Sequence, residues 1–295
     1  MKISVVIPTV NRPRAILEVT KDLLIQSGID FELLVVDQSQ EDNQELVSLS
    51  RRDSRLRYIH SHDVGTCRAR NLGASQAASD IVVFFDDDVR IEDQVLLQKH
   101  VQNYHDATIG GVGGRVIDVN TALNRQQSGP VCQVSATGQV YANATSLTRQ
   151  DIKAPRGGHM SFRRSVISQV GGFDERFRGN AMREETDFSL RTTRAGWRIV
   201  FDPTVTITHL ALAGGSRTKE RIAWYEDFFF NEFYFILKNF PIWVIGLTLV
   251  RKTRPILACA IYYGRLKWRA VTAPWRMLRQ AWQLTRRRGQ VRLSP

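Results

Sequence analysis

The sequence predicts an α/β protein whose core is a Rossmann-like, doubly wound, mostly parallel sheet. Three mainly apolar segments, Ile3–Ile7, Phe31–Val36 and Ile81–Phe85, are rich in β-branched and aromatic residues, and the last is apolar throughout. Runs of this kind are typical of strands that are buried on both faces. Segments with helical spacing of apolar residues lie between them, and this alternation favours right-handed crossovers and parallel strands.

The remaining elements of the first half follow from local signals. Pro13 opens the first helix and Gly28 ends it, as proline and glycine commonly do at helix termini. We expect helices over 13–27, 41–49, 65–78 and 91–105, and a short strand over 56–59.

The second half is predicted to continue the α/β pattern. A glycine-rich strand is expected over 109–119, followed at 120–153 by a polar loop or hairpin insertion. Further elements are expected as helices over 166–170 and 183–195 and as strands over 197–201 and 204–208.

Charge separates a neutral body from a basic C-terminal extension. The formal charge is +12, and 12 of the 41 Lys and Arg residues lie in 251–295, where there is no Asp or Glu. The rest of the chain is neutral, with 29 basic and 29 acidic residues. Because the excess basic charge belongs to a C-terminal tail and not to residues 1–250, no nucleic acid partner is expected.

The extension from residue 216 to residue 295 is predicted to be helical, and its first part is dense in aromatic residues (224–240). Its apolar runs, 241–250 and 256–263, are shorter than the ~20 residues that a membrane-spanning helix needs. Amphipathic, basic helices suit an anionic membrane surface. The alternative is an ordinary helical subdomain whose aromatic residues form a core.

Cysteine usage and the N-terminus indicate a reducing, cytoplasmic compartment. Cys67, Cys132 and Cys259 are far apart and show no Cys-x-x-Cys spacing, so neither a zinc site nor a disulfide framework is predicted. Met1 and Lys2 lead directly into a strand, and no signal peptide is recognised.

Three consecutive carboxylates, Asp86, Asp87 and Asp88, follow the strand that ends at Phe85. Ligands of open α/β sheets bind outside the carboxyl ends of the strands, where Asp37 is also expected. Oxygen ligands favour Mg²⁺ or Mn²⁺, which commonly also contact substrate phosphates. The alternative is a solvated acidic turn that caps the next helix.

The order and spacing of several motifs resemble those of the family 2 glycosyltransferases, which have the GT-A fold. The resemblance covers about residues 1–215. It is carried by Val5–Thr9, Val35–Asp37, Gly65–Gly73, Phe85–Asp88, Gly171–Glu175, Glu184–Arg191 and Ala195–Trp197.

The resemblance implies transfer of a sugar from a nucleotide-diphosphate sugar, with inversion at the anomeric carbon. The nucleotide of this donor is expected to be UDP, with GDP and dTDP as alternatives. It divides residues 1–215 into a nucleotide-sugar half (1–119) and an acceptor and catalytic-base half (120–215). The donor side would contain Pro8, Thr9, Asn11, Arg12, Asp37, Arg70, Asp86 and Asp87. The resemblance also implies Asp86, Asp88 and His209 as metal ligands, Glu185 as catalytic base, and Gly158, His159 and Glu184 on the acceptor side.

Physical reasoning agrees with these roles and leaves alternatives open. Inverting transfer needs a carboxylate within about 3 Å of the acceptor hydroxyl, and a Lewis acid for the departing diphosphate. Glu184 and Glu185 are neighbours and diverge on a helix, so they cannot both face one bond. Glu185 also suits a purely structural place at a helix N-terminus, and His209 suits a structural histidine. Asp187 and Arg191 have the spacing of a structural ion pair.

Other functions fit the sequence less well. Residues 8–13 lack the Gly-x-Gly-x-x-Gly of a nicotinamide dehydrogenase, and also the glycine-rich basic loop of a sugar nucleotidyltransferase. A degenerate transferase that only binds membranes or nucleic acid is opposed by Asp86, Asp88 and Glu185. We therefore expect a metal-dependent glycosyltransferase that acts on a saccharide or lipid-linked acceptor, in polysaccharide or glycolipid assembly at the inner face of the cell membrane.

Overall fold

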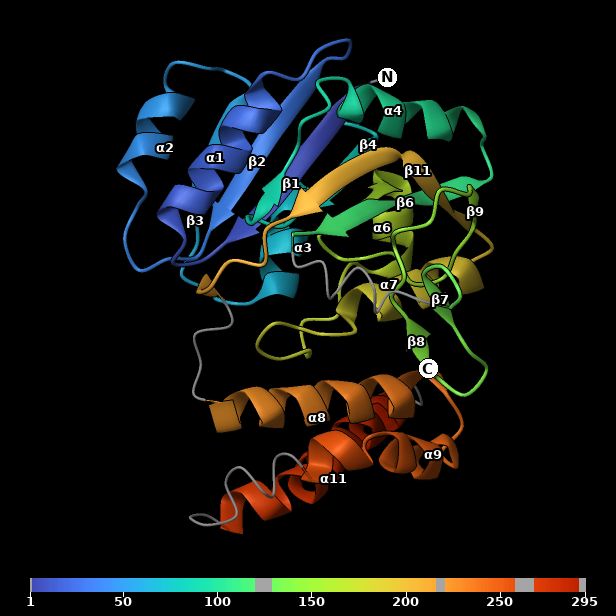
Figure 1. Ribbon diagram of the computed structural model, residues 1–295. Coiled ribbons are helices and arrows are strands. Elements are labelled where there is room, and N and C mark those ends of the chain that lie inside the picture. The colour runs from blue at the N-terminus through green and yellow to red at the C-terminus, as the bar shows by residue number, and fades with distance from the viewer. Residues whose placement is uncertain (1, 120–128, 216–220, 258–267, 292–295) are drawn as a thin grey trace.

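The computed structural model describes residues 2–119, 129–215, 221–257 and 268–291 (Figure 1). The part of the apolar run 256–263 that begins at residue 258 lies outside these ranges, as do residues 120–128 of the polar insertion. The N-terminal elements are β1 (Ile3–Thr9), α1 (Pro13–Leu24), β2 (Phe31–Asp37), α2 (Gln44–Ser50), β3 (Leu56–His60), α3 (Thr66–Gln76), β4 (Ile81–Phe85), β5 (Val89–Arg90), α4 (Leu96–Gln102), the 3₁₀ turn η1 (Asn103–His105) and β6 (Ile109–Asp118).

The second half supplies the short strands of the insertion, two long elements of the sheet domain and the helical extension. Its elements are β7 (Gln133–Val134), β8 (Val140–Tyr141), β9 (Gln150–Asp151), β10 (His159–Arg163), α6 (Arg164–Val170), α7 (Glu184–Arg194), β11 (Arg198–His209), α8 (Arg221–Asn239), α9 (Val244–Arg251) and α11 (Trp268–Val291).

The predicted α/β class is confirmed by a central sheet with strand order β3-β2-β1-β4-β10-β6-β11-β5. β1, β2, β3 and β4 are parallel neighbours, and β6 and β11 are parallel to each other. β10 lies between β4 and β6 and runs antiparallel to both. The chain enters β10 from a turn beside the carboxyl end of β4, where the Asp86 amide donates to the Gly158 carbonyl, so β10 must run in the opposite direction.

The apolar runs form the core as predicted, because their side chains are buried on both faces of the sheet. β11 differs from the prediction in being one strand instead of two. Its register with β6 shifts between Asp202 and Thr206, on either side of Pro203. Proline lacks the amide donor of a regular ladder, which explains the irregularity within a continuous strand.

The helical extension is present as α8, α9 and α11, which form a layer beneath the sheet domain in the view of Figure 1. Five aromatic residues of α8 are buried in the core, as expected for an ordinary helical subdomain. These residues are Phe229, Phe230, Phe233, Tyr234 and Phe235. Among the described helices, none combines the length and apolar content needed to cross a bilayer.

Buried charges join α8 to α7. Lys238 Nζ lies 2.7 Å from Asp174 Oδ2 and 2.6 Å from Asp187 Oδ2. The predicted pair of Asp187 with Arg191 is formed at 3.0 Å, and the Asn239 amide also donates to Asp187. The helical layer is therefore fixed to the sheet domain through the helix that begins with Glu184.

Candidate active site

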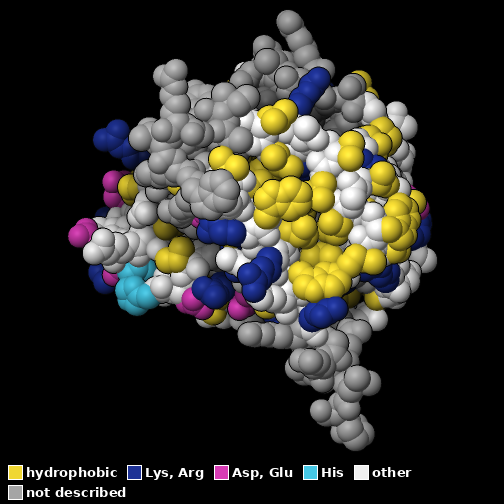
Figure 2. Space-filling model, turned by 90° about the horizontal axis from the view of Figure 1, so that it is seen from below, with side chains coloured by type: hydrophobic (Ala, Val, Ile, Leu, Met, Phe, Trp, Pro, Cys, Tyr) yellow, Lys and Arg dark blue, Asp and Glu magenta, His cyan; other side chains and the backbone are white. Residues whose placement is uncertain are grey.

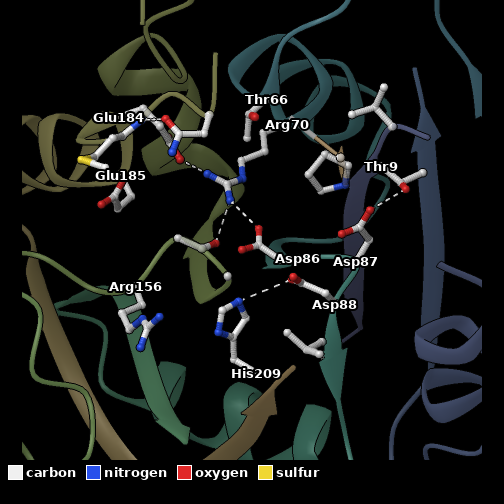
Figure 3. Close-up of a pocket in the computed structure, with 18 of the residues that line it drawn as sticks. Thr9, Thr66, Arg70, Asp86, Asp87, Asp88, Arg156, Glu184, Glu185 and His209 are labelled. Atoms are coloured by element: carbon white, nitrogen blue, oxygen red, sulfur yellow. Dashed lines mark hydrogen bonds and ion pairs between the residues drawn. The ribbon is translucent and has the colours of Figure 1, made fainter. Parts of the chain in front are cut away.

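A cavity of about 420 Å³ opens at the carboxyl ends of β1 and β4. Its wall also includes the turn before β10, the first residues of α7 and the end of β11, so elements far apart in sequence meet there (Figure 3). Most of the predicted site residues line it: Pro8, Thr9, Arg12, Arg70, Asp86, Asp87, Asp88, Gly158, Glu184, Glu185 and His209.

The three consecutive aspartates face three different partners (Figure 3). Asp86 accepts a hydrogen bond from Arg70 Nη2 at 3.1 Å. Asp87 accepts from Thr9 Oγ1 at 2.7 Å, and Asp88 faces His209, with 3.6 Å between Oδ1 and Nε2. This divergence follows from the chain leaving β4 in a turn, and it gives each carboxylate a separate environment.

Arg12 connects the turn after β1 to two of these carboxylates. Its Nη1 atom lies 2.7 Å from Asp87 Oδ1 and 3.1 Å from Asp88 Oδ2. The other end of the guanidinium donates to the carbonyls of Leu212 and Gly214. Burial nevertheless raises the pKa of Asp87 to about 6, against the opposing effects of the Thr9 hydrogen bond and the Arg12 charge.

Strand pairing places His209 beside Asp88. In β11, His209 is opposite Val89 of β5 on one side and Asp118 of β6 on the other. Its Nδ1 atom lies 2.5 Å from Asp118 Oδ1, and this contact orients the ring. The other ring nitrogen, Nε2, therefore faces Asp88.

The two adjacent glutamates at the start of α7 lie in different environments. Glu184 is buried and forms an ion pair with Arg70, whose Nη2 also donates to the Gly157 carbonyl. Glu185 lines the cavity and forms no ion pair with any residue that the structure describes. Desolvation raises the pKa of Glu185 above its usual range, opposed in part by the charges of Arg183 and Arg70.

Arg183 stands immediately before these glutamates in a left-handed conformation, with φ of 82°. Its Nη2 atom lies 2.5 Å from Oε1 of the buried Glu232 of α8. Lys252, at the end of α9, lies 3.1 Å from the other oxygen of Glu232. A chain of direct ionic contacts therefore runs from α9 to the edge of the cavity.

Three predicted site residues, Asn11, Asp37 and His159, do not line the cavity. Asp37 is buried and accepts hydrogen bonds from Ser39 and from the Tyr58 hydroxyl. Asn11 donates its amide to Ser39 from a backbone with φ of 54°.

His159, expected on the acceptor side, is fully buried and stacks on Phe85. Its Nε2 atom lies 2.9 Å from His100 Nε2, and its Nδ1 atom lies 3.3 Å from the Arg115 carbonyl oxygen. Because Gly114 has no side chain, the imidazole can occupy that space; a Cβ atom there would collide with the ring. Its place is the core of the sheet, and it does not line the cavity.

The structure adds cavity residues that the sequence did not single out, namely Gln38, Arg156 and Arg183, while Asp118 lies behind His209. Arg156 Nη1 lies 2.8 Å from Asp118 Oδ2. Asp118 ends β6 as Asp37 ends β2, so its position at the carboxyl end of a strand could have singled it out from the sequence. Ala142 also lines the cavity, which gives the polar insertion a contact with the site.

The donor set partly fits a divalent cation. Within the described ranges no three or more His, Cys, Asp and Glu side chains are gathered closely enough to hold a metal ion by themselves. Asp88 Oδ1 and His209 Nε2 nevertheless face each other at 3.6 Å, too far for a direct hydrogen bond. Mg²⁺ sites commonly use only one or two carboxylates and complete their shell with substrate phosphates and water.

The open, mostly parallel sheet and the carboxylate-bearing cavity at its strand ends define a GT-A protein. The sequence matches the model of glycosyl transferase family 2 over residues 4–171. The chain belongs to this family.

Two curated relatives illustrate the range of similarity. An uncharacterized glycosyltransferase of Rickettsia felis is 38% identical over 99 residues, which covers 33% of this chain and 16% of that protein. The O-antigen chain rhamnosyltransferase RfbN of Salmonella typhimurium is 20% identical over 276 residues, which covers 83% of this chain and 84% of that protein. This chain therefore spans only a small part of the length of the Rickettsia relative.

Two solved structures share the fold. The mannosyltransferase PcManGT of Pyrobaculum calidifontis, in complex with GDP-Man and Mn²⁺, superposes with a TM-score of 0.59 at 18% identity and covers 99% of this chain and 80% of its own. S. aureus TarS in complex with UDP superposes with a TM-score of 0.56 at 19% identity, covering 80% of this chain and 64% of its own. At these identities the likeness shows the GT-A fold alone.

Proposed function

We propose that this chain transfers a sugar from a nucleotide-diphosphate sugar to an acceptor hydroxyl, with inversion and with help from a divalent cation. The observation that carries the proposal is the opposition of two kinds of carboxylate across one cavity. Asp88 is paired with His209 and Arg12 at the strand ends, while Glu185 has a raised pKa and no ion-pair partner among the described residues.

Glu185 is the proposed proton acceptor. A general base works best when its pKa is close to the operating pH, and desolvation moves the Glu185 pKa in that direction. Glu184 is the weaker candidate because Arg70 neutralises it. Arg70 also contacts Asp86, so one guanidinium positions a carboxylate from each half of the proposed site.

Asp88 and His209 are the proposed cation ligands, and Asp118 and Arg12 hold them in place. The cation, when bound, would stabilise the charge that develops on the departing diphosphate. Asp86 stands close to the same position but faces Arg70. The other donor-side residues are Pro8, Thr9 and Arg12, beside Gln38; Asn11 and Asp37 are proposed only as supports for this wall.

The proposed setting is assembly of a cell-surface polysaccharide or glycolipid at the inner face of the membrane, with residues 1–215 as the transferase domain and 216–295 as its extension. The names of relatives support it: one is an O-antigen chain rhamnosyltransferase, and another, from Campylobacter jejuni, is named as a β-1,3-glucosyltransferase of a GalNAc-containing PP-undecaprenol. UDP, GDP and dTDP sugars are the donors to be compared.

The test begins with calorimetric titration of the protein with UDP, GDP and dTDP, each with and without Mn²⁺. Release of nucleoside diphosphate is then followed from the corresponding nucleotide sugars, with and without a panel of simple glycosides as acceptors. We expect Glu185→Gln to abolish turnover while nucleotide binding stays unchanged. Glu175→Gln is the matched control, because that carboxylate is exposed and outside the cavity.

Each contrary result has a distinct meaning. Near-normal turnover by Glu185→Gln would remove Glu185 from its role. Release of pyrophosphate in place of nucleoside diphosphate would indicate sugar nucleotidyl transfer. Failure of the folded protein to bind all three nucleotides would favour a degenerate transferase that acts only as a binding module.

A further inference from the structure

An apolar surface lies on the outer side of the helical layer. We call it the α9/α11 face and define it by the exposed residues Ile242, Trp243, Leu247 and Val250 of α9 and its preceding turn, and Val271 and Trp275 of α11. Trp243 is 60% exposed and Trp275 is 58% exposed, values that are unusual for the largest apolar side chain. Figure 2, seen from below, shows apolar side chains gathered on this side of the molecule.

The α9/α11 face is a separate feature from the core of the helical layer. On α9, Trp243, Leu247 and Val250 follow one another at spacings of four and three, which places them on one side of the helix. Val244 and Thr248 occupy the other side and are buried. The helical layer therefore has a packed core, and α9 also carries a second apolar stripe that is exposed on the outer side.

The charged residues of α9 and α11 themselves are all arginine. Arg254 and Arg279 are exposed, and Arg251 is exposed while donating to the Thr137 carbonyl. No Asp or Glu follows Glu232 in the sequence, and Glu232 itself is buried. Figure 2 shows Lys and Arg side chains beside the apolar surface. A partner for this face is therefore both apolar and anionic.

We propose that the α9/α11 face docks on an anionic lipid surface, with Trp243 and Trp275 inserted at the headgroup level and the arginines facing lipid phosphates. Tryptophan favours this interfacial depth because its ring is apolar and its N–H is polar. A second copy of the chain is the poorer occupant, because a symmetric contact would bring the same cations together. Insertion parallel to the surface also agrees with the absence of a bilayer-crossing helix among the described residues.

The docked face is connected to the cavity by short contacts. Lys252 at the end of α9 reaches Glu232, and Glu232 reaches Arg183 on the cavity wall. Docking would therefore place the lipid surface against the helices that carry these contacts to the cavity wall. This step deepens the proposed function, on which it rests, by assigning the acceptor to molecules that are carried in the membrane.

Vesicle flotation tests the docking itself and needs neither donor nor acceptor. The probes are vesicles of phosphatidylcholine with and without phosphatidylglycerol. We expect binding only with phosphatidylglycerol, and weaker binding as salt increases. The double variant Trp243→Ala with Trp275→Ala should lose at least about tenfold in affinity. Arg254→Gln and Arg279→Gln should each lose about fivefold, since a charge near such a surface contributes about 1 kcal/mol.

The matched control is the double variant Ile25→Ala with Leu147→Ala, whose side chains are 56% and 75% exposed but lie outside the α9/α11 face. It should bind vesicles as the wild type does, and circular dichroism and thermal melting should show that all variants fold. Vesicle binding that survives the tryptophan double variant would overturn the proposal. So would absence of vesicle binding combined with a dimer that this variant converts to a monomer, because the face would then be a self-interface.

The variant Glu185→Gln separates this inference from the proposed function. It should bind vesicles like the wild type although it lacks turnover. Absence of vesicle binding by a wild-type protein that has transferase activity would refute only the docking, whereas vesicle binding by a wild-type protein without any turnover would refute only the transferase activity.

Discussion

Replacing Lys238 by methionine tests how the helical layer is held to α7. The ammonium lies within 2.7 Å of both Asp174 and Asp187, and all three side chains are at most 8% exposed. Removing one partner of a buried pair typically costs 3–5 kcal/mol. Because Asp187 keeps Arg191 and Asp174 keeps the Tyr234 hydroxyl, we expect the lower end, about 3 kcal/mol.

The assay is thermal unfolding followed by circular dichroism. A loss of about 3 kcal/mol corresponds to a fall in Tm of about 6 to 12 °C for a chain of this size. Lys21→Met is the matched control, since Lys21 forms a pair with Glu18 at 2.8 Å but both side chains are more than half exposed. Surface pairs of this kind contribute at most about 1 kcal/mol. An equal fall in Tm for the two variants would refute the reasoning from burial.

Three further predictions concern the cavity. Asp118→Asn should raise the Mn²⁺ concentration needed for half-maximal nucleotide binding about 10- to 100-fold, because His209 loses the carboxylate that orients it; an unchanged value in calorimetry would contradict this. The raised pKa of Glu185 predicts that kcat/KM falls as the pH drops through a value above its ordinary 4.5, since the base must be deprotonated; a pH-rate profile that is flat down to that value would oppose it. Gly158→Ala should weaken nucleotide binding while the protein stays folded, because a Cβ atom there would meet Asp86 Oδ2 at 2.6 Å; calorimetry beside a melting curve decides this.

The sheet was predictable because each buried strand carries its own signal. Runs such as Val5–Ile7 and Ile81–Phe85 are apolar throughout, and their short length and β-branched residues favour a strand covered on both faces. The direction of β10 carries no such signal. It depends on the path of the chain before residue 159, and the polar composition of that segment does not determine a path.

The cavity was predictable where a residue follows a strand or opens a helix. Asp86, Asp88, Glu185 and His209 all line it, which agrees with their expected location although their roles await the tests above. Which way a side chain points was less predictable, and His159 illustrates this. Its burial depends on space above Gly114, a residue 45 positions earlier on a neighbouring strand.

The extension has both a buried core and an exposed apolar face. Its aromatic first helix is core, whereas the residues of the α9/α11 face are exposed, so composition alone could not separate the two. Deleting residues 251–295 would remove α11, in which Met277 and Ala281 are buried. Point substitutions at exposed positions are therefore the cleaner way to study its surface.

The left-handed backbone of Arg183 links the start of α7 to the C-terminal helices. A non-glycine residue at φ of 82° costs about 1 kcal/mol, and the contact with Glu232 of α8 offsets that cost one residue before the paired glutamates. An exchange of the C-terminal helices between relatives would have to preserve this contact, or the start of α7 would relax. Engineering that exchanges the C-terminal helices therefore has to treat α8 and the start of α7 as one unit.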